Sequence, residues 1–281
     1  RTSREDLLEL GRVAGKLGIQ GKEDIAGFVR AADQIKVALS EDLGGNVEES
    51  INQVGKLVGV FHLEEELGLE KSMLSVGSAI NSLGASSKAN EGYIVEFTNR
   101  VAGVAPGAGV SIQNVMGLGA TMDNLAQSAE VSGTTYGQVM MGMQKKTQDY
   151  ARIAGMSLED FRKLLDEDAN EAFLKFLEGL GSVDMETRVK MLSSLKLDGQ
   201  RSSQVLGVLA DNTDMLRQQQ ALANEEFAKA TSLTEEYNTK NESAAAIVEK
   251  RRKVMDRALT DLGEKLFPLW SEVLGLSGNL L

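Results

Sequence analysis

The sequence predicts an all-α protein, in which a globular body of short helices interrupted by glycine is followed by one long helix, straight or bent. Helix-forming residues are plentiful and aromatic residues make up only 5% of the chain, whereas strands favour aromatic and β-branched residues. No window alternates polar and apolar residues over the length of a strand. Of the 29 glycines, 26 precede Val208, and residues 208–262 contain neither Gly nor Pro. Gly and Pro interrupt helices, so the two parts differ in how often their helices break.

Three regions follow from this distribution. Residues 1–207 are expected to form a helical core body, and residues 208–262 a long helix, which would span roughly 80 Å if unbroken, at about 1.5 Å per residue. Whether this helix stands free or folds back on the body stays open. Residues 263–281 are expected to begin a further helical segment. The chain begins with Arg1 rather than Met and stops at Leu281, so we expect it to be a fragment of a longer protein.

The first sixty residues predict three helices. Apolar residues recur at helical spacing between Leu7 and Leu17, and the run Gly18–Gly21 ends that helix. A second amphipathic helix runs from Ile25 to Leu39, with Asp42–Asn46 as its exit. A third covers Ser50–Gly59.

The middle of the chain repeats one pattern, a helix of about 11 to 16 residues that ends in Gly or a cluster of small residues. Ser111 and Ser157 are expected to be N-caps, because their side chains can accept orphan amide groups of the first helical turn. The predicted helices are 72–83, 92–102, 111–125, 133–148, 157–165, 169–179 and 185–195.

The long helix has only a weak heptad pattern. Leu216, Ala223, Ala230, Tyr237 and Ala244 recur every seven residues, with Phe227 and Val248 at companion positions. The polar residues Gln220, Thr234 and Asn241 occupy the rest of that seam, where a strong coiled coil has Leu or Ile. We therefore expect this helix to lean on the body or on another copy, and to bend or fray at Thr239–Ser243.

Composition restricts the classes of function. The net charge of −11 argues against nucleic-acid binding, because Lys and Arg must neutralise phosphates. The basic cluster Lys250–Lys253 could attract an anion, but such a short run more often forms a solvated helix face. The absence of cysteine excludes disulfides and thiol chemistry and suits a reducing cytoplasm. No apolar run reaches the roughly 18 residues of a membrane helix, and no signal-peptide pattern is present.

The sequence predicts no catalytic, cofactor-binding or metal-ligating residue, and therefore no enzyme. His62 is the single histidine, and we interpret it as a surface or packing residue. The acidic runs Glu64–Glu66 and Glu235–Glu236 are expected to be solvated, since neither is visibly paired with a positioned base.

Glycine clusters raise the alternative of phosphate binding. The run Gly117–Met122 begins like a dinucleotide-binding motif, but it lacks the third glycine and no predicted strand precedes it. We expect small residues to let helices approach closely instead. These are Gly117, Gly119, Ala120, Gly137 and Gly142. Methionines 140, 141 and 143 are expected to fill the core.

Four short motifs follow one another between Gly84 and Met140. They are a Phe-x-x-Arg stretch at Phe97–Arg100, a Gly-rich break at Gly103–Gly109, Gly-x-Gly-Ala at Gly117–Ala120 and a Gly-Thr turn at Gly133–Thr135. This order resembles the core region of phage tail tape-measure proteins. The flanking stretches Leu17–Phe28, Leu195–Arg201 and Leu262–Pro268 agree with it, so the resemblance covers Leu17 to Leu274.

The resemblance implies a structural protein of the virion tail. Tape-measure proteins are long helical chains inside the tail tube, and their length sets how many rings of tube protein assemble. The implied partners are the tail tube protein, tail assembly chaperones and other copies of the chain, and the implied place of assembly is the host bacterial cytoplasm. The family has no catalytic or ligand residues to carry over to this region.

Two alternatives remain from the residues alone. A non-phage helical scaffold or oligomerisation protein would share every compositional feature. A helical glycan hydrolase using Glu or Asp would need two positioned carboxylates, for which the sequence has no visible pattern.

Overall fold

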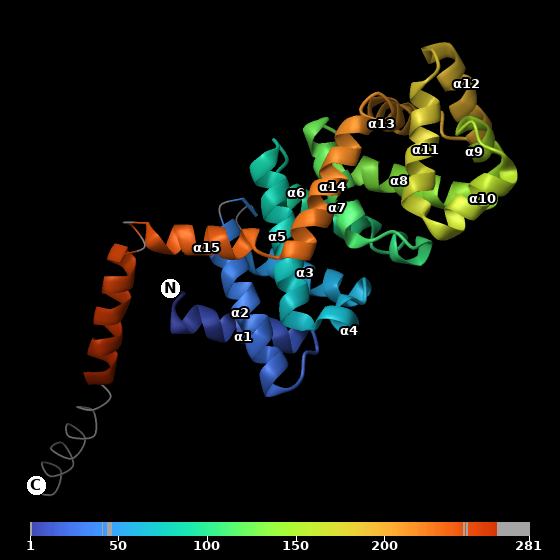
Figure 1. Cartoon of the computed structure of the whole chain (residues 1–281). Helices are drawn as coiled ribbons and strands as arrows, with labels where there is room; N and C mark the ends of the chain where they lie inside the picture. The colour runs from blue at the N-terminus through green and yellow to red at the C-terminus, as the bar shows by residue number, and fades with distance from the viewer. Residues whose placement is uncertain (1, 41, 44–46, 244, 246, 263–281) are drawn as a thin grey trace, which may run out of the picture.

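The computed structural model describes residues 2–40, 42–43, 47–243, 245 and 247–262. Every regular element in these ranges is helical, which confirms the all-α prediction (Figure 1). The elements are α1 (Arg4–Lys16), α2 (Lys22–Leu39), α3 (Val47–Val60), α4 (Leu63–Leu67), α5 (Leu69–Ser86), α6 (Glu91–Val101), η1 (Pro106–Ala108), α7 (Ile112–Asn124), α8 (Ala129–Lys145), α9 (Thr147–Ile153), α10 (Leu158–Glu167), α11 (Ala169–Gly181), α12 (Met185–Leu195), α13 (Gln200–Ala210), α14 (Thr213–Lys229) and α15 (Ser232–Glu242). Residues 247–262 are also helical.

The predicted helix starts agree with the observed ones where a side chain caps the helix. Ser111 accepts a hydrogen bond from the Asn114 amide at the start of α7, and Ser157 accepts one from the Asp160 amide at the start of α10. The bounds of the helix predicted at 133–148 differ from those observed for α8. It starts at Ala129, because Ser128 caps it, and it ends at Lys145.

Two hydrophobic cores lie side by side in the body. One is built on α1, α2, α3 and α5, and the other on α8 to α13. Helices α6, α7 and α14 lie between them and contribute to both (Figure 1). For example, Ile112 and Met116 of α7 belong to the first core, whereas Val115 and Leu118 belong to the second. A helix with two apolar faces is expected in the middle layer of a domain.

The expectation of a single helix over 208–262 is wrong. Helix α13 crosses the predicted boundary at 207/208 and ends at Ala210, and α14 then runs from Thr213 to Lys229. Ala230 has a left-handed backbone with φ of 55°, and α15 follows from Ser232. Absence of Gly and Pro therefore did not produce a continuous rod.

Burial explains why the segment breaks. α14 packs on α7 and α5, and α15 packs on α2 and α5, so that Leu216, Ala223 and Leu233 are completely buried. Burying each of the leucine side chains stabilises the fold by roughly 1.5–3 kcal/mol, which outweighs the few helical hydrogen bonds lost at the corners. The segment folds back on the body. The predicted bend at Thr239–Ser243 coincides with the end of α15, where the backbone of Ser243 leaves the helical conformation, with φ of −58° and ψ of 149°.

The remaining part of the chain follows α15. The helical residues 247–262 project away from the body (Figure 1). No described helix is long and apolar enough to cross a membrane. The further helical segment predicted at 263–281 lies outside the described residues.

Candidate functional site

The structural centre of the molecule is the junction that α14 forms between the two cores. Its residue Leu216 belongs to the core of α8–α13, and its Ala223 and Phe227 belong to the core of α1–α5. The same helix therefore contacts both halves within three turns. We define the α14 junction as the contacts of Arg217, Gln220 and Gln219 with α7 and α11.

Close approach of two backbones forms the first part of the junction. A Cβ atom on Gly117 of α7 would lie 2.6 Å from the Cα atom and 2.7 Å from the backbone nitrogen of Gln220. Atoms of a backbone cannot move aside as the end of a side chain can, so only glycine fits here. The prediction that Gly117 lets helices approach closely is confirmed.

The other glycines that were predicted to let helices approach closely differ in how tight their contacts are. A Cβ on Gly142 would meet the Tyr150 hydroxyl, and one on Gly119 would lie 3.0 Å from the Phe97 ring. At Gly137 the nearest atom is 3.8 Å away, in Val104, which is an ordinary contact. Gly117–Met122 lies inside α7, and Gly117 to Met122 are buried. Its amides therefore serve the helix and do not form a phosphate-binding turn.

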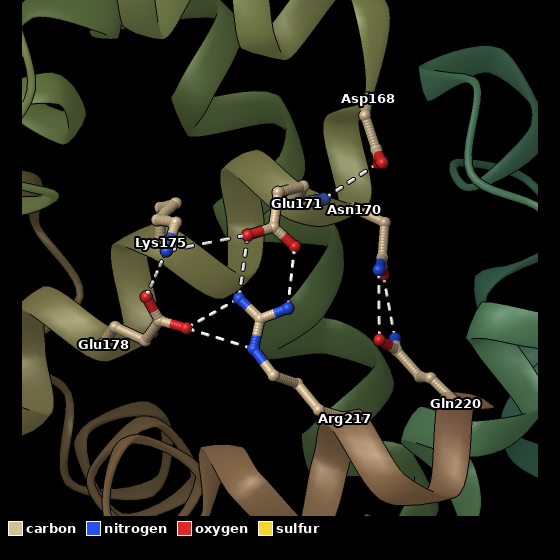
Figure 2. Close-up of polar contacts among 7 residues, drawn as sticks. All are labelled: Asp168, Asn170, Glu171, Lys175, Glu178, Arg217 and Gln220. Atoms are coloured by element: carbon tan, nitrogen blue, oxygen red, sulfur yellow. Dashed lines mark hydrogen bonds and ion pairs between the residues drawn. The ribbon is translucent and has the colours of Figure 1, made fainter. Parts of the chain in front are cut away.

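A buried pair of amides forms the second part of the junction. The Asn170 side chain of α11 donates from Nδ2 to Gln220 Oε1 at 3.0 Å, and Gln220 Nε2 donates to Asn170 Oδ1 at 2.8 Å (Figure 2). Gln220 Nε2 also donates to the Asn114 carbonyl of α7 at 3.1 Å. Gln220 is only 4% exposed, and both of its amide hydrogens have acceptors. A polar residue that weakens a self-associating seam thus ties α14 to α7 and α11.

A charged cluster at the rim forms the third part. Arg217 donates from Nη1 and Nη2 to the two carboxylate oxygens of Glu171, each at 2.8 Å. It also donates to Glu178 Oε1, from Nη2 at 2.6 Å and from Nε at 3.1 Å (Figure 2). Lys175 donates to Glu178 Oε2 at 2.8 Å. Two-point contacts of a guanidinium with a carboxylate fix orientation as well as charge.

Protonation equilibria in the cluster follow from these contacts. Partial burial raises the pKa of Glu178, but hydrogen bonds from Lys175 and Arg217 outweigh it, so the pKa lies below its usual range. The hydrogen bonds that Arg217 donates to Glu171 and to Glu178 raise the pKa of Arg217, although partial desolvation acts in the opposite direction. Each side chain is about a third exposed, so the cluster is partly screened by water. The cluster fixes the position of α14 against α11.

A second arginine, Arg188, is buried at the far end of the body. The guanidinium of Arg188 in α12 donates to Asp211 Oδ1 at 2.6 Å and to Oδ2 at 3.1 Å, and its Nε donates to the Leu180 carbonyl at 2.9 Å. The hydrogen bonds from Arg188 hold the pKa of Asp211 below its usual range. This side chain joins the ends of α11 and α13.

The residues weighed for chemistry lie apart from these contacts. The imidazole of His62 is 74% exposed, with Nδ1 at 3.3 Å from Glu65, so its interpretation as a surface residue is confirmed. Residues 64–66 are exposed as predicted, and Arg251 and Arg252 lie exposed on the helix formed by residues 247–262. Within the described part of the chain, no group of three or more His, Cys, Asp or Glu residues could hold a metal ion.

The methionine prediction is confirmed for two residues and wrong for one. Met140 and Met143 are buried, whereas Met141 is 50% exposed. Positions 140 and 143 lie on one face of α8 and position 141 is turned by about 100° from 140, so it cannot share that face.

Sequence reasoning missed the α14 junction. Glu171, Lys175 and Glu178 have the spacing of neighbours on one helix face, which marks a charged stripe in advance. Their partner Arg217 lies 39 to 46 residues further along the chain, and no local pattern connects it to them.

Comparison with known families gives the class. The sequence model of the phage-related minor tail proteins matches residues 1–196, which cover α1 to α12. The chain belongs to the phage-related minor tail protein family. It is a structural component of a phage tail, which does not agree with the non-phage scaffold considered above. No curated protein and no solved structure matches the chain.

Proposed function

We propose that this chain is the core region of a tape-measure protein, which lies inside the tail tube and sets tail length during assembly. The observation that carries the proposal is that the family match covers α1 to α12 of a helical body, from which the chain departs as an exposed helix at 247–262. A fixed body with an extension is the arrangement that a ruler needs, since only extended chain contributes length in proportion to residue number.

The fold determines which residues can contribute to the length of the ruler. Helices α14 and α15 pack on the body, so adding residues there would disturb the two cores. Residues 247–262 depart from the body and can be lengthened without that effect. The ruler therefore begins beyond α15 and not at Val208.

The partners follow the same proposal. Tail tube protein would surround the extended part, assembly chaperones would cover it before the tube forms, and other copies would lie beside it. Assembly would take place in the host bacterial cytoplasm, and the chain would remain in the virion tail. We propose no catalytic role for Glu171 and Glu178, because both carboxylates are bound by Arg217 and Lys175 and serve as contacts between helices.

Tail length in the intact phage tests the proposal. Duplicating residues 248–261, two heptads, adds about 21 Å of helix at about 1.5 Å per residue, so the mean tail length in electron micrographs should increase in step with each further duplication.

A matched control separates length from sequence. In a variant with residues 248–261 in permuted order, the length of the chain is unchanged and tails should keep their normal length. Infective particles whose tails stay the same length after duplication would contradict the ruler role.

A further inference from the structure

Helix 247–262 carries an apolar stripe that the body does not cover. Half of the exposed large apolar side chains in the described residues lie within 247–262. They are Ile247, Val248, Val254, Met255, Leu259 and Leu262, each between 44% and 68% exposed. At about 100° per residue they fall within an arc of about 140° on one side of the helix, together with Ala258.

Charges are ordered around this stripe. The helix contains five basic and three acidic residues, within a chain of net charge −11. By the same helical spacing, Lys250 and Arg257 border the stripe on one edge, next to Asp261, and Arg252 borders it on the other. Glu249 and Asp256 lie on the opposite side of the helix. Cations therefore border the apolar stripe, while two of the three acids face away from it.

The position of Arg251 indicates what kind of surface the apolar stripe can bind. By helical position it lies within the stripe, between Ala258 and Leu262, and it is exposed. In a parallel bundle of identical helices this would bring like charges together in the seam, which is destabilising. At a lipid surface a long basic side chain instead extends to the headgroups while its stem lies among apolar groups.

We propose that helix 247–262 binds an anionic lipid surface, with the apolar stripe in the headgroup and acyl boundary and the bordering cations on lipid phosphates. An amphipathic helix with Lys and Arg beside its apolar face binds in the plane of a membrane interface. This is contact with one leaflet and needs no spanning helix, and it does not depend on the tape-measure role. Projection of the helix away from the acidic body (Figure 1) leaves the stripe accessible.

Vesicle flotation of the whole chain tests charge dependence. The chain should float with vesicles of phosphatidylglycerol and phosphatidylcholine at low salt, and much less with phosphatidylcholine alone or in 1 M salt, where charges are screened beyond about 3 Å. Each basic residue near an anionic surface strengthens binding about fivefold. The double variant Arg252→Gln/Arg257→Gln should therefore bind about 25-fold more weakly, whereas Glu249→Gln/Asp256→Asn on the opposite side should not lose binding.

A site-specific label tests which face contacts lipid. The chain has no cysteine, so a single introduced cysteine is labelled uniquely. A polarity-sensitive dye on Met255→Cys should shift to the blue on anionic vesicles, whereas the same dye on Asp256→Cys should not. These adjacent residues lie on different sides of the helix and outside both cores, so neither variant should unfold the body, which circular dichroism checks.

Three outcomes would overturn the proposal. They are equal flotation with neutral and anionic vesicles, equal dye responses at positions 255 and 256, and no flotation at all. Loss of a vesicle-independent oligomer in Met255→Asp, measured by analytical ultracentrifugation, together with absent flotation would assign the stripe to a second copy instead.

Discussion

At the scale of single residues, the body depends on positions where helices meet with no room for change. Gly117 allows the backbones of α7 and α14 to touch, and Gln220 fills the same contact with an amide whose hydrogens both have acceptors. These two residues explain how a polar segment can be buried. The cost of desolvating Gln220 is offset by its three hydrogen bonds.

The variant Gly117→Ala should destabilise the fold. Its methyl group would meet backbone atoms of Gln220, and overpacking of this kind typically costs about 1–3 kcal/mol. Gly11→Ala is the matched control, because it also lies within a helix but nothing lies within 4 Å of its added carbon. The control should stabilise the protein by about 0.5–1 kcal/mol. Urea unfolding midpoints measure both, and equal shifts would contradict the close approach.

The Arg217 cluster should make stability depend on pH at the acidic end. Because the pKa of Glu178 is lowered in the folded state, its contribution is present above the unfolded value of about 4.3 and is lost as the pH falls through the folded value. Partial exposure limits the contribution to about 1 kcal/mol. The free energies of unfolding of Arg217→Gln and the parent should differ at pH 7 and converge below that range. A difference that stays constant with pH would contradict this assignment.

At the scale of elements, the corner between α14 and α15 is the feature that turns a rod into part of the body. The corner residue Ala230 has a left-handed backbone, which costs an alanine roughly 1–2 kcal/mol. On the far side of the corner, α15 is held by polar contacts. Thr234 donates to Gln34 Oε1 at 2.8 Å and Lys240 donates to the Ala38 carbonyl at 2.6 Å.

The variant Ala230→Gly distinguishes the corner from a continuous helix by the sign of its effect. At a left-handed position glycine removes the strain, so unfolding in urea should cost up to about 1 kcal/mol more. Inside an unbroken helix the same change would lower stability by about 1 kcal/mol. Ala223→Gly, within α14, is the control that should be destabilising. A lower stability of Ala230→Gly would contradict the corner.

At the scale of the whole molecule, the sequence predicted the helices better than their packing. Bounds such as 111–125 and 157–165 could be predicted because Ser caps and helical apolar spacing are local signals. The break at Ala230 could not, since it carries no Gly or Pro and results from burial of Leu216, Ala223 and Leu233 against helices that lie much earlier in the chain. The candidate junction was missed for the same reason.

Native-state hydrogen exchange tests most directly whether α14 closes the body and helix 247–262 lies outside it. Amides of α14 should exchange through the same opening reaction as those of α7, with opening free energies near that of global unfolding. Amides of 247–262 should exchange far faster, because no packing protects that helix. Exchange of α14 as fast as that of 247–262 would contradict the junction, and would restore a long helix that stands apart from the body.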